Sequence, residues 1–337
     1  MTGPRGLVLL VSLIAAIGAA SHAQEAAPQP PNPFLPAPYR LVLDWPPPDP
    51  GLTLGAAYQV QPDAQGNLWV AHRGTPPIVR IDPRSGKVLG GFGEGMFVGL
   101  HGLTIDSGGN IYVADCPGGR GFDEAALKSG TKGYQVFKFS PDGTLLMTLG
   151  RAGVSRPGRD TFSCPTDVVV GSNGDIFVTD GHDGGPNHYG DRVAKFSRHG
   201  TFIKNIAESG SAPGQVWEPH GITIDSQARL FVGDRGNNRI QIFDQEGGLI
   251  DMWKQFSRPG GLYVDTRTDT LYVSDANSNA QNHPDWGHGI RIGSAKSGAL
   301  HYFIPGTDPE GVAVDADGNV FAAITRVRLE KWEKLVR

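Results

Sequence analysis

Three side chains of metal-binding types, His101, His220 and Glu310, each stand directly before a glycine and a short apolar run. Two neutral imidazoles and one carboxylate, with one side left open to solvent, suit a catalytic divalent ion such as Zn²⁺ and also match the set that binds Fe(II). A single histidine before a glycine is usually a solvated loop residue, but three ligand types in equivalent positions favour a metal site. We expect a site for Zn²⁺, or for another divalent transition metal, if the fold brings these three residues together.

Four further side chains are candidates for catalysis and substrate binding. Arg73 and Arg235 occupy equivalent positions just past the end of a predicted strand, from which two guanidiniums could clamp a substrate carboxylate. Each arginine could instead fix its own loop. His182 and Tyr189 lie in an enlarged loop nearby, and a histidine or tyrosine beside a cation can transfer a proton near neutral pH.

The elements that must position these residues belong to an internal repeat. Its unit is a glycine, an apolar residue, any residue, an apolar residue, an aspartate, a tight turn and a second short strand. Copies begin at residues 59, 102, 167, 221, 261 and 311, about 50 residues apart, which fits four-stranded blades rather than a shorter solenoid repeat. A single blade cannot bury both of its faces. We therefore predict an all-β fold, a six-bladed β-propeller.

The two ends of the chain are expected to meet in this ring. The segment Tyr39–Asp44 has the pattern of a strand but has no blade of its own. We predict that it pairs with Arg328–Trp332 in the last blade, so that N-terminal and C-terminal strands close the ring.

Propeller topology brings the three metal-binding side chains together. The first strand of each blade lines the central channel, so the residue just before it lies at the channel mouth. Counting five residues back from the first turn residue, an aspartate in five copies and Gly171 in the other, gives one such residue in each blade: Tyr58, His101, Thr166, His220, Gly260 and Glu310. The three ligand candidates come from alternate blades and approach the axis from three directions.

Composition and charge exclude some classes of protein and partner. The chain has 48 glycines and 26 prolines, and only 19% of its residues are charged, which argues against a helical bundle. The formal charge of −4 gives no positive excess for a phosphate backbone, so nucleic acid is not an expected partner. We expect a monomer that binds a small molecule or peptide bearing a carboxylate.

The first 23 residues have the pattern of a signal peptide. Arg5 precedes the apolar run Leu7–Ala20, and a small-residue cleavage site ends at Ala23. The alternative is an uncleaved N-terminal anchor, although the run is shorter than the roughly 20 residues that span a bilayer. We expect export to the periplasm or secretion and no membrane association after cleavage. A Pro/Ala-rich linker over residues 24–38 then precedes a propeller over residues 39–337.

The chain has two cysteines, Cys116 and Cys164. The first follows the second strand of blade two, and the other lies two residues before the start of blade three, so both belong to the same face of adjacent blades. In an exported protein we predict a disulfide between them. It closes a loop of about 49 residues and contributes on the order of 4 kcal/mol. Two free thiols are the alternative.

Six motifs resemble those of NHL-repeat propellers and, among these, of the bacterial relatives of peptidyl-α-hydroxyglycine α-amidating lyase. The resemblance covers the chain from about Tyr39 to Trp332. The motifs are Val70-Ala-His-Arg73-Gly74, Leu100-His101-Gly102, Cys164-Pro-Thr-Asp167-Val168, Thr179-Asp180-Gly181, Pro219-His220-Gly221 and Asp234-Arg235-Gly-Asn-Asn-Arg239-Ile240.

The resemblance implies a chemistry and assigns residues to it. In that lyase three histidines hold Zn²⁺ on the propeller axis, and an arginine and a tyrosine assist cleavage of a carbinolamide into a peptide amide and glyoxylate. The resemblance implies that Arg73 binds substrate, that His101 and His220 are zinc ligands and that Arg235 forms part of the active-site wall. The fold is then a propeller of NHL-type repeats.

Three positions depart from the family pattern. The third zinc histidine is replaced by Glu310, the acidic calcium ligand after it by Gly311 and the tyrosine by His182. Glu310 can still bind a metal, and His182 or Tyr189 can still act as a base, so a metal-dependent lyase on the same or a different substrate is predicted. A structural Ca²⁺ is not expected, since glycine offers only its carbonyl.

Two alternatives to the lyase are kept. The first is a non-catalytic propeller that binds a ligand or another protein, because the fold alone implies no activity. The second is a lactonase-like hydrolase. Lactonase relatives usually carry an acidic and Asn-rich calcium site, whereas the predicted ring is rich in histidine.

Overall fold

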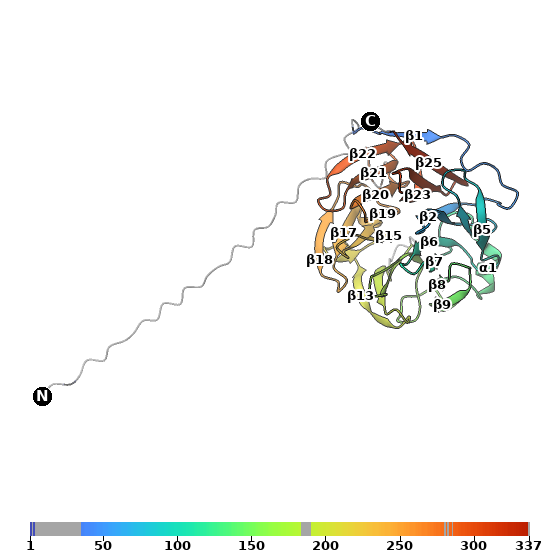
Figure 1. Cartoon of the computed structure of the whole chain (residues 1–337). Coiled ribbons are helices and arrows are strands. Elements are labelled where there is room, and N and C mark those ends of the chain that lie inside the picture. Colours follow the sequence, from blue (N-terminus) through green and yellow to red (C-terminus); the bar gives the residue numbers. More distant parts are fainter. Residues whose placement is uncertain are drawn as a thin grey trace.

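The computed structural model describes residues 35–182, 190–279, 281, 283–284 and 286–335, together with Met1 and Gly3. Apart from those two residues, the predicted signal peptide and the linker up to residue 34 lie outside this range. The described chain forms six β-sheets arranged in a ring around a common axis (Figure 1). The prediction of an all-β, six-bladed propeller is therefore confirmed.

Each blade is an antiparallel meander of four strands. Blade one contains β2 (Ala57–Pro62), β3 (Leu68–His72), β4 (Ile78–Ile81) and β5 (Val88–Phe92). Blade two contains β6 (Leu100–Ile105), β7 (Ile111–Asp115), β8 (Gln135–Phe139) and β9 (Leu145–Leu149). Blade three contains β10 (Pro165–Val170), β11 (Ile176–Asp180), β12 (Arg192–Phe196) and β13 (Phe202–Ser209), with the short β14 (Gln215–Val216) parallel to β13.

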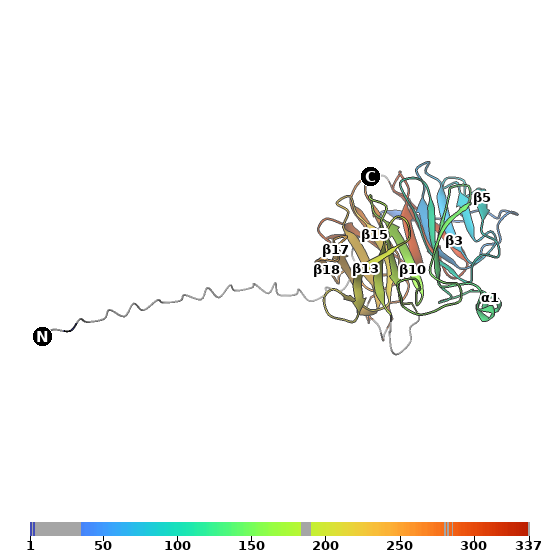
Figure 2. The ribbon, with the colours of Figure 1, turned by 90° about the horizontal axis from the view of Figure 1, so that it is seen from below.

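The second half of the ring follows the same plan. Blade four contains β15 (Pro219–Ile224), β16 (Leu230–Asp234), β17 (Arg239–Phe243) and β18 (Leu249–Trp253). Blade five contains β19 (Leu262–Asp265), β20 (Thr270–Asp275), β21 (Gly289–Ser294) and β22 (Leu300–Pro305). Blade six contains β23 (Pro309–Val314), β24 (Val320–Ile324), β25 (Arg328–Lys334) and β1 (Tyr39–Val42). The helices are short: α1 (Glu124–Ser129), at the outer edge beside blade two (Figure 2), and the 3₁₀ turn η1 (Arg235–Asn237).

The ring closes as predicted, through strands from both ends of the chain. β1 pairs antiparallel with β25, with Tyr39 opposite Lys334 and Val42 opposite Lys331. The Leu335 N–H donates to the Pro38 carbonyl at 2.8 Å, which extends the closure by one more bond. The first strands contact one another in order around the axis, from β2 through β6, β10, β15, β19 and β23 back to β2.

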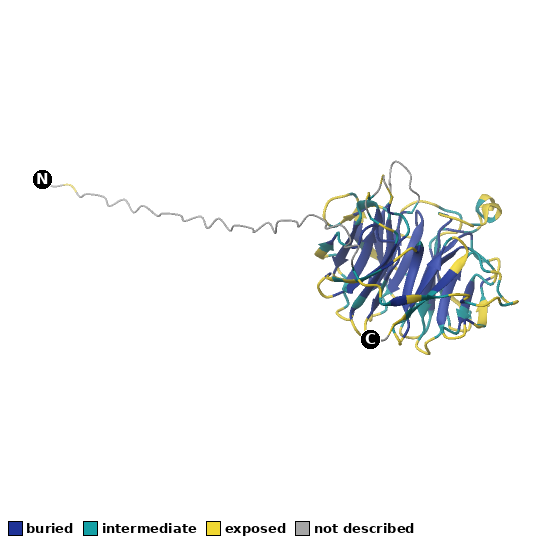
Figure 3. Cartoon of the chain, turned by 90° about the horizontal axis from the view of Figure 1, so that it is seen from above, coloured by how far each residue is buried: buried dark blue, intermediate teal, exposed yellow. Residues whose placement is uncertain are grey.

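The core lies between neighbouring blades, because both faces of an inner strand are covered. All five residues of β7 and all five of β16 are buried, whereas the outer strands β9 and β18 are mostly exposed. Figure 3 shows buried strands through the body of the molecule and exposed residues gathered at its loops and margins. Each fully buried aliphatic or aromatic side chain contributes roughly 1.5–3 kcal/mol. These six interfaces make the inner strands a rigid frame. No helix in the described part of the chain is long and apolar enough to cross a membrane.

In blades two, three and four, the aspartate that ends the second strand anchors the loop leading into the first strand of the same blade. Asp115 accepts hydrogen bonds from the N–H groups of Val98 and Gly99, the latter at 2.6 Å. Asp180 accepts from Cys164 at 2.8 Å, and Asp234 accepts from Trp217 at 2.7 Å. These carboxylates fix the segments that carry the residues at the channel mouth.

Blade one has His72 at the position of this aspartate. Its Nδ1 accepts hydrogen bonds from the N–H groups of Gly55, at 3.2 Å, and Gly74, at 3.1 Å. Burial lowers the pKa of His72 to about 4, so the imidazole is neutral at physiological pH. A neutral acceptor nitrogen therefore does in blade one what a carboxylate does in blades two, three and four.

Candidate metal centre

His101, His220 and Glu310 meet at the propeller axis, and His182 joins them. One potential ligand atom from each of the four residues lies within 4.8 Å of the other three. Two ligands on opposite sides of one ion, with bonds of about 2.0–2.2 Å, are at most about 4.4 Å apart. Inward shifts of a few tenths of an ångström would therefore let all four share an ion. The four residues come from blades two, three, four and six.

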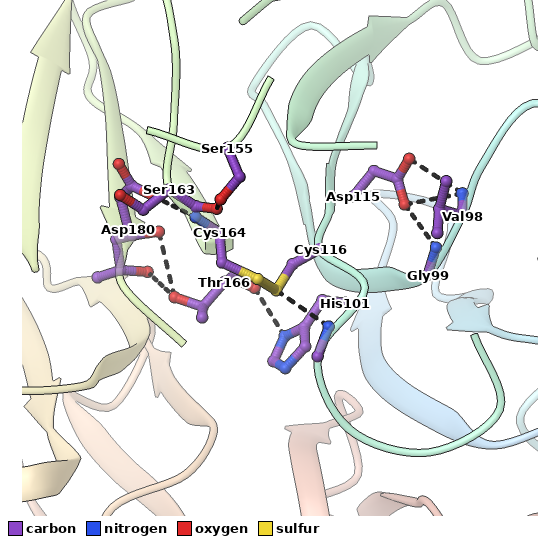
Figure 4. Close-up of a disulfide and its surroundings, with 12 residues drawn as sticks. Val98, Gly99, His101, Asp115, Cys116, Ser155, Ser163, Cys164, Thr166 and Asp180 are labelled. Atoms are coloured by element: carbon purple, nitrogen blue, oxygen red, sulfur yellow. Dashed lines mark hydrogen bonds between the residues drawn. A yellow bond between two sulfur atoms is a disulfide. The ribbon is translucent and has the colours of Figure 1, made fainter. Parts of the chain in front are cut away.

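The ring of His101 is oriented by a backbone carbonyl. Its Nδ1 lies 2.8 Å from the Thr166 carbonyl oxygen (Figure 4), so Nδ1 carries the proton and Nε2 presents its lone pair. Nε2 is buried and has no hydrogen-bond partner among the described residues. A buried nitrogen without a partner is costly unless something binds it, and a metal ligand oriented by a backbone carbonyl has this arrangement.

His220 repeats this arrangement two blades later. Its ring interacts with the backbone of Gly260, the channel-mouth residue of the next blade, as the His101 ring does with that of Thr166. Nε2 of His220 lies 3.0 Å from Oε1 of Glu310 but does not form a hydrogen bond with it. Two acceptor atoms this close, with no proton directed between them, are arranged as ligands of a shared cation are.

The three histidines are in the protonation state that binds metals. Burial is the main cause that lowers the pKa of His101, His182 and His220 well below the ordinary value. The neighbouring imidazoles add to this effect at His101, and the Arg235 guanidinium adds to it at His182 and His220. All three rings are therefore neutral at physiological pH, as metal ligation requires.

The backbone around His182 is fixed by two glycines. Gly181 has φ +138°, and a Cβ added there would lie 2.1 Å from Oδ1 of Asp191, so only glycine fits. The Gly181 N–H donates to the Cys164 carbonyl at 3.0 Å. On the other side, a Cβ on Gly118 would lie 2.5 Å from Nδ1 of His182. The imidazole is thus placed by close packing on one side and by a backbone bond on the other.

The predicted disulfide between Cys116 and Cys164 is present (Figure 4). The two Cα atoms are 4.9 Å apart. The bridge connects the two segments that flank His182, because Gly118 follows Cys116 by two residues and Gly181 is bonded to Cys164. The covalent link between blades two and three therefore also holds the pocket of His182.

Arg73 lies beside the cluster, but its guanidinium is largely used by backbone carbonyls. Nε donates to Leu100, Nη1 to Arg120, and Nη2 to both Gly99 and Cys116, at distances of 2.8–3.2 Å. The guanidinium also lies 3.9 Å from the centre of the Tyr58 ring. One of its five N–H groups is left without a partner among the described residues. Arg73 thus cross-links the loops on either side of His101.

Arg235 also lies beside the cluster, and its guanidinium is less committed. Nη1 is 3.7 Å from Oε1 of Glu310, and Nε is 3.8 Å from Oε2 of Glu218, both beyond hydrogen-bond distance. Only 6% of the residue is exposed, and its Nε has no hydrogen-bond partner within the described chain. A buried cation with only long ion pairs can accept a substrate anion without first losing strong bonds.

Sequence reasoning missed a second buried arginine, Arg258, next to Arg235. Its Nη1 donates to the Arg235 carbonyl at 2.9 Å, and its Nη2 donates to Oε2 of Glu218 at 3.0 Å. Burial and then the charge of Arg235 lower the pKa of Arg258. Arg258 is two residues before Gly260, the mouth residue of blade five, and that spacing is the only signal in the sequence.

The structure thus brings together six of the seven residues predicted for the site. Tyr189 lies outside the described residues, so its predicted role stays a prediction. His182 stands among the candidate metal ligands, although the sequence indicated proton transfer. The signal that could have revealed it is its position two residues after Asp180, which ends β11.

Comparisons with known proteins agree with this architecture. The family model of the NHL repeat matches residues 162–188 and 217–243. NHL repeat-containing protein 3 of Mus musculus is 30% identical over 246 residues, which cover 72% of this chain and 67% of that protein. Peptidyl-glycine alpha-amidating monooxygenase B of Xenopus laevis is 34% identical over 282 residues, and peptidyl-alpha-hydroxyglycine alpha-amidating lyase 1 of Drosophila melanogaster is 29% identical over 282 residues.

The alignments cover different fractions of the related proteins. Each of the last two alignments covers 76% of this chain, but 29% of the frog protein and 48% of the fly lyase. Among solved structures, a streptogramin B lyase has a TM-score of 0.55 at 13% identity and covers 84% of this chain and 94% of its own. A gluconolactonase of Xanthomonas campestris has the same TM-score at 16% identity, over 83% and 86%. These structures share the fold, and the sequence relatives establish that the chain belongs to the NHL-repeat family of β-propeller proteins.

Proposed function

We propose that this protein is an exported, metal-dependent carbon–nitrogen lyase of the amidating type. Its substrate is an N-acylated α-hydroxyglycine or a related carbinolamide with a free carboxylate. The observation that carries the proposal is the group of three neutral imidazoles and one carboxylate on the axis, next to the under-coordinated guanidinium of Arg235. The likeness to the fly lyase and the frog monooxygenase supports this choice of reaction.

The donor atoms fit a divalent transition metal. The unsatisfied nitrogens of His101 and His220 and the nearby Glu310 carboxylate would hold it, while inner strands fix their backbones. Such an ion, when bound, would polarise the substrate hydroxyl and make its proton easier to remove. In the overall reaction the hydroxyl proton leaves oxygen, a C=O bond forms, the C–N bond breaks, and the amide nitrogen gains a proton.

The residues around the cluster define what the site attracts. Three guanidiniums, those of Arg73, Arg235 and Arg258, stand with the two carboxylates of Glu218 and Glu310. A bound dication would add two positive charges beside these guanidiniums. A substrate carboxylate is therefore attracted electrostatically. We assign its direct contact to Arg235, while His182 and Tyr189 are the sequence-based candidates for moving the proton.

The disulfide supports the proposed location. Disulfides form and persist in the periplasm and outside the cell, and are rare in the cytosol. Together with the signal-peptide pattern at the N-terminus, the Cys116–Cys164 bridge favours an exported protein. We propose that the mature chain acts there as a monomer.

The experiment that tests this function is direct. Metal-loaded protein is incubated with N-acylated α-hydroxyglycines, and glyoxylate and the amide are quantified with and without a chelator. Arg235→Ala is expected to lower kcat/KM. The loss should correspond to about 2–5 kcal/mol of transition-state stabilisation, as when a charged partner is removed. Arg84→Ala is the matched control, because the Arg84 side chain is 85% exposed. Metal-loaded protein that releases no glyoxylate from several such substrates rejects the proposal.

A further inference from the structure

We propose that His182 is a fourth protein ligand, so that the metal centre consists of three imidazoles and one carboxylate and holds an ion that takes five or six ligands. The inference deepens the proposed function, because it concerns the same site. It changes the role expected for His182 from proton carrier to ligand. It also specifies the class of ion.

The first reason is that His182 is as close to the other two histidines as they are to each other. The ring centres of His101 and His220 are 4.7 Å apart. The ring centre of His182 is 5.0 Å from that of His101 and 5.2 Å from that of His220. One ion bound by His101 and His220 therefore also lies beside the imidazole of His182.

The second reason is that no hydrogen-bond partner of His182 is found among the described residues. Its Nδ1 is buried without a hydrogen-bond partner among the described residues, and no hydrogen bond to its other ring nitrogen is found there. An imidazole that transfers protons needs a partner that orients it and receives the proton. The ring instead stands against Gly118, where any side chain would collide with it. This packing limits rotation of the ring and keeps it at the axis.

The third reason concerns how the position is held. Gly181 is fixed through its N–H by the Cys164 carbonyl, and Cys164 is linked covalently to Cys116, two residues before Gly118. The segments on both sides of His182 are therefore cross-linked to each other. Metal sites need donor atoms placed within about half an ångström by supports of this kind. A loop side chain that swings between substrate and solvent does not need them.

The number of ligands determines which ions suit the centre. Four protein ligands complete the tetrahedral shell of Zn²⁺ and leave no open position in it, whereas ions that take five or six ligands keep one or two positions for substrate oxygen. Imidazoles with one carboxylate suit Fe²⁺, Co²⁺ and Ni²⁺, and the carboxylate also suits Mn²⁺. We assign this class of ion to the centre.

The experiment counts the imidazole ligands with Co²⁺ as the probe. The full chain is loaded with Co²⁺, and proton NMR is used to count the sets of ring protons shifted by the paramagnetic ion. The wild type is expected to show three sets, and His182→Ala and His101→Ala two each. His301→Ala, an exposed control, is expected to keep three. Two sets in the wild type, or no Co²⁺ binding, overturn the proposal without relying on any variant.

Affinity and the visible spectrum give two further readings. Competition with a chelating dye is expected to show that His182→Ala weakens Co²⁺ binding at least about 100-fold, since even supporting residues cost 10–100-fold. An affinity within twofold of the wild type overturns the proposal. The wild-type Co²⁺ spectrum is expected to show the weak bands of a five- or six-coordinate ion, and the intense bands of a tetrahedral ion would overturn the assigned class.

The readings separate this inference from the proposed function. Three shifted imidazole sets with no glyoxylate release support the inference and reject the amidating activity. Two sets with metal-dependent glyoxylate release reject the inference and support the activity.

Discussion

Polar side chains gather at both ends of the propeller, and the two ends use them differently. At the end where the first two strands of a blade are joined, five of the six turns begin with an aspartate: Asp63, Asp106, Asp225, Asp265 and Asp315. Each of these carboxylates accepts hydrogen bonds from N–H groups of its own turn. Their bonding capacity is therefore used for local structure.

At the other end, buried polar atoms are left without such partners. Nitrogens of His101, His182, His220 and Arg235 have no hydrogen-bond partner among the described residues. The turn end nevertheless has a cavity of about 420 Å³ lined by several of its aspartates. The comparison teaches that a group of adjacent buried ring nitrogens without hydrogen-bond partners locates the site better than the size of a hollow or the number of charges.

The largest effect is expected when candidate metal ligands are removed from the end that carries the histidines. The His101→Ala, His220→Ala double variant is expected to lose its divalent ion completely, because two of the donor atoms are removed. Asp106→Asn at the turn end is expected to keep close to one ion per chain. Elemental analysis of the purified proteins measures both. Stoichiometric metal in the double variant would place the site elsewhere.

The second largest effect is expected from the disulfide that supports the metal end. Replacement of Cys116 and Cys164 by serine removes a link across a sequence separation of 48 residues. Chain-entropy arithmetic gives a loss of about 4 kcal/mol in the free energy of unfolding, measured by denaturant titration of the metal-free protein. Because the bridge also holds both sides of His182, metal affinity is expected to fall about tenfold. An unchanged metal affinity in a folded variant would show that the disulfide does not support the metal centre.

The repeat predicted much of this molecule because it fixes positions relative to strands. Blade number, ring closure and the convergence of His101, His220 and Glu310 all depend on the spacing between a residue and the strand that follows it. The place of His182 depends instead on the path of a loop after a strand. That path is set by Gly118 and by the disulfide, which belong to other parts of the sequence.

The roles of His72 and Arg73 could not be predicted from the sequence for a similar reason. His72 takes the place of an anchoring aspartate, and Arg73 donates to carbonyls that lie 26–47 residues away in sequence. Carbonyl groups occur at every residue, so no sequence pattern identifies such partners. Side-chain types can therefore indicate a site, but only the fold shows which of them are already bonded.

His72 provides a pH test of the anchoring role. Its pKa is about 4 in the folded chain and about 6.5 in the unfolded chain, so the unfolded chain takes up the proton first as pH falls. The stability that neutral His72 provides is fully present above pH 6.5 and is lost as pH falls towards 4, by about 3 kcal/mol in total. His72→Asn keeps an acceptor for the Gly55 N–H but cannot titrate.

The expected result is a difference between two proteins. Denaturant titrations at pH 7 and at pH 4.5 should show that the wild type loses more stability than His72→Asn, while the exposed control His301→Asn behaves like the wild type. The histidines at the axis contribute equally to all three proteins, so the difference isolates His72. Equal losses in the wild type and His72→Asn would show that His72 is not the anchoring group.

The smallest expected effect separates the two arginines beside the centre. Arg73→Lys keeps the positive charge but loses the planar fork that reaches four carbonyls, so the free energy of unfolding is expected to fall by about 2 kcal/mol. Because most of its N–H groups are already bonded, KM for a carboxylate substrate should change by less than about threefold. Arg235→Lys is expected to show the reverse, with nearly unchanged stability and a KM raised about tenfold or more. An Arg73→Lys variant with wild-type stability and a raised KM would assign the substrate carboxylate to Arg73, as the sequence resemblance implies, and would show that carbonyl bonds seen without substrate can be exchanged for it.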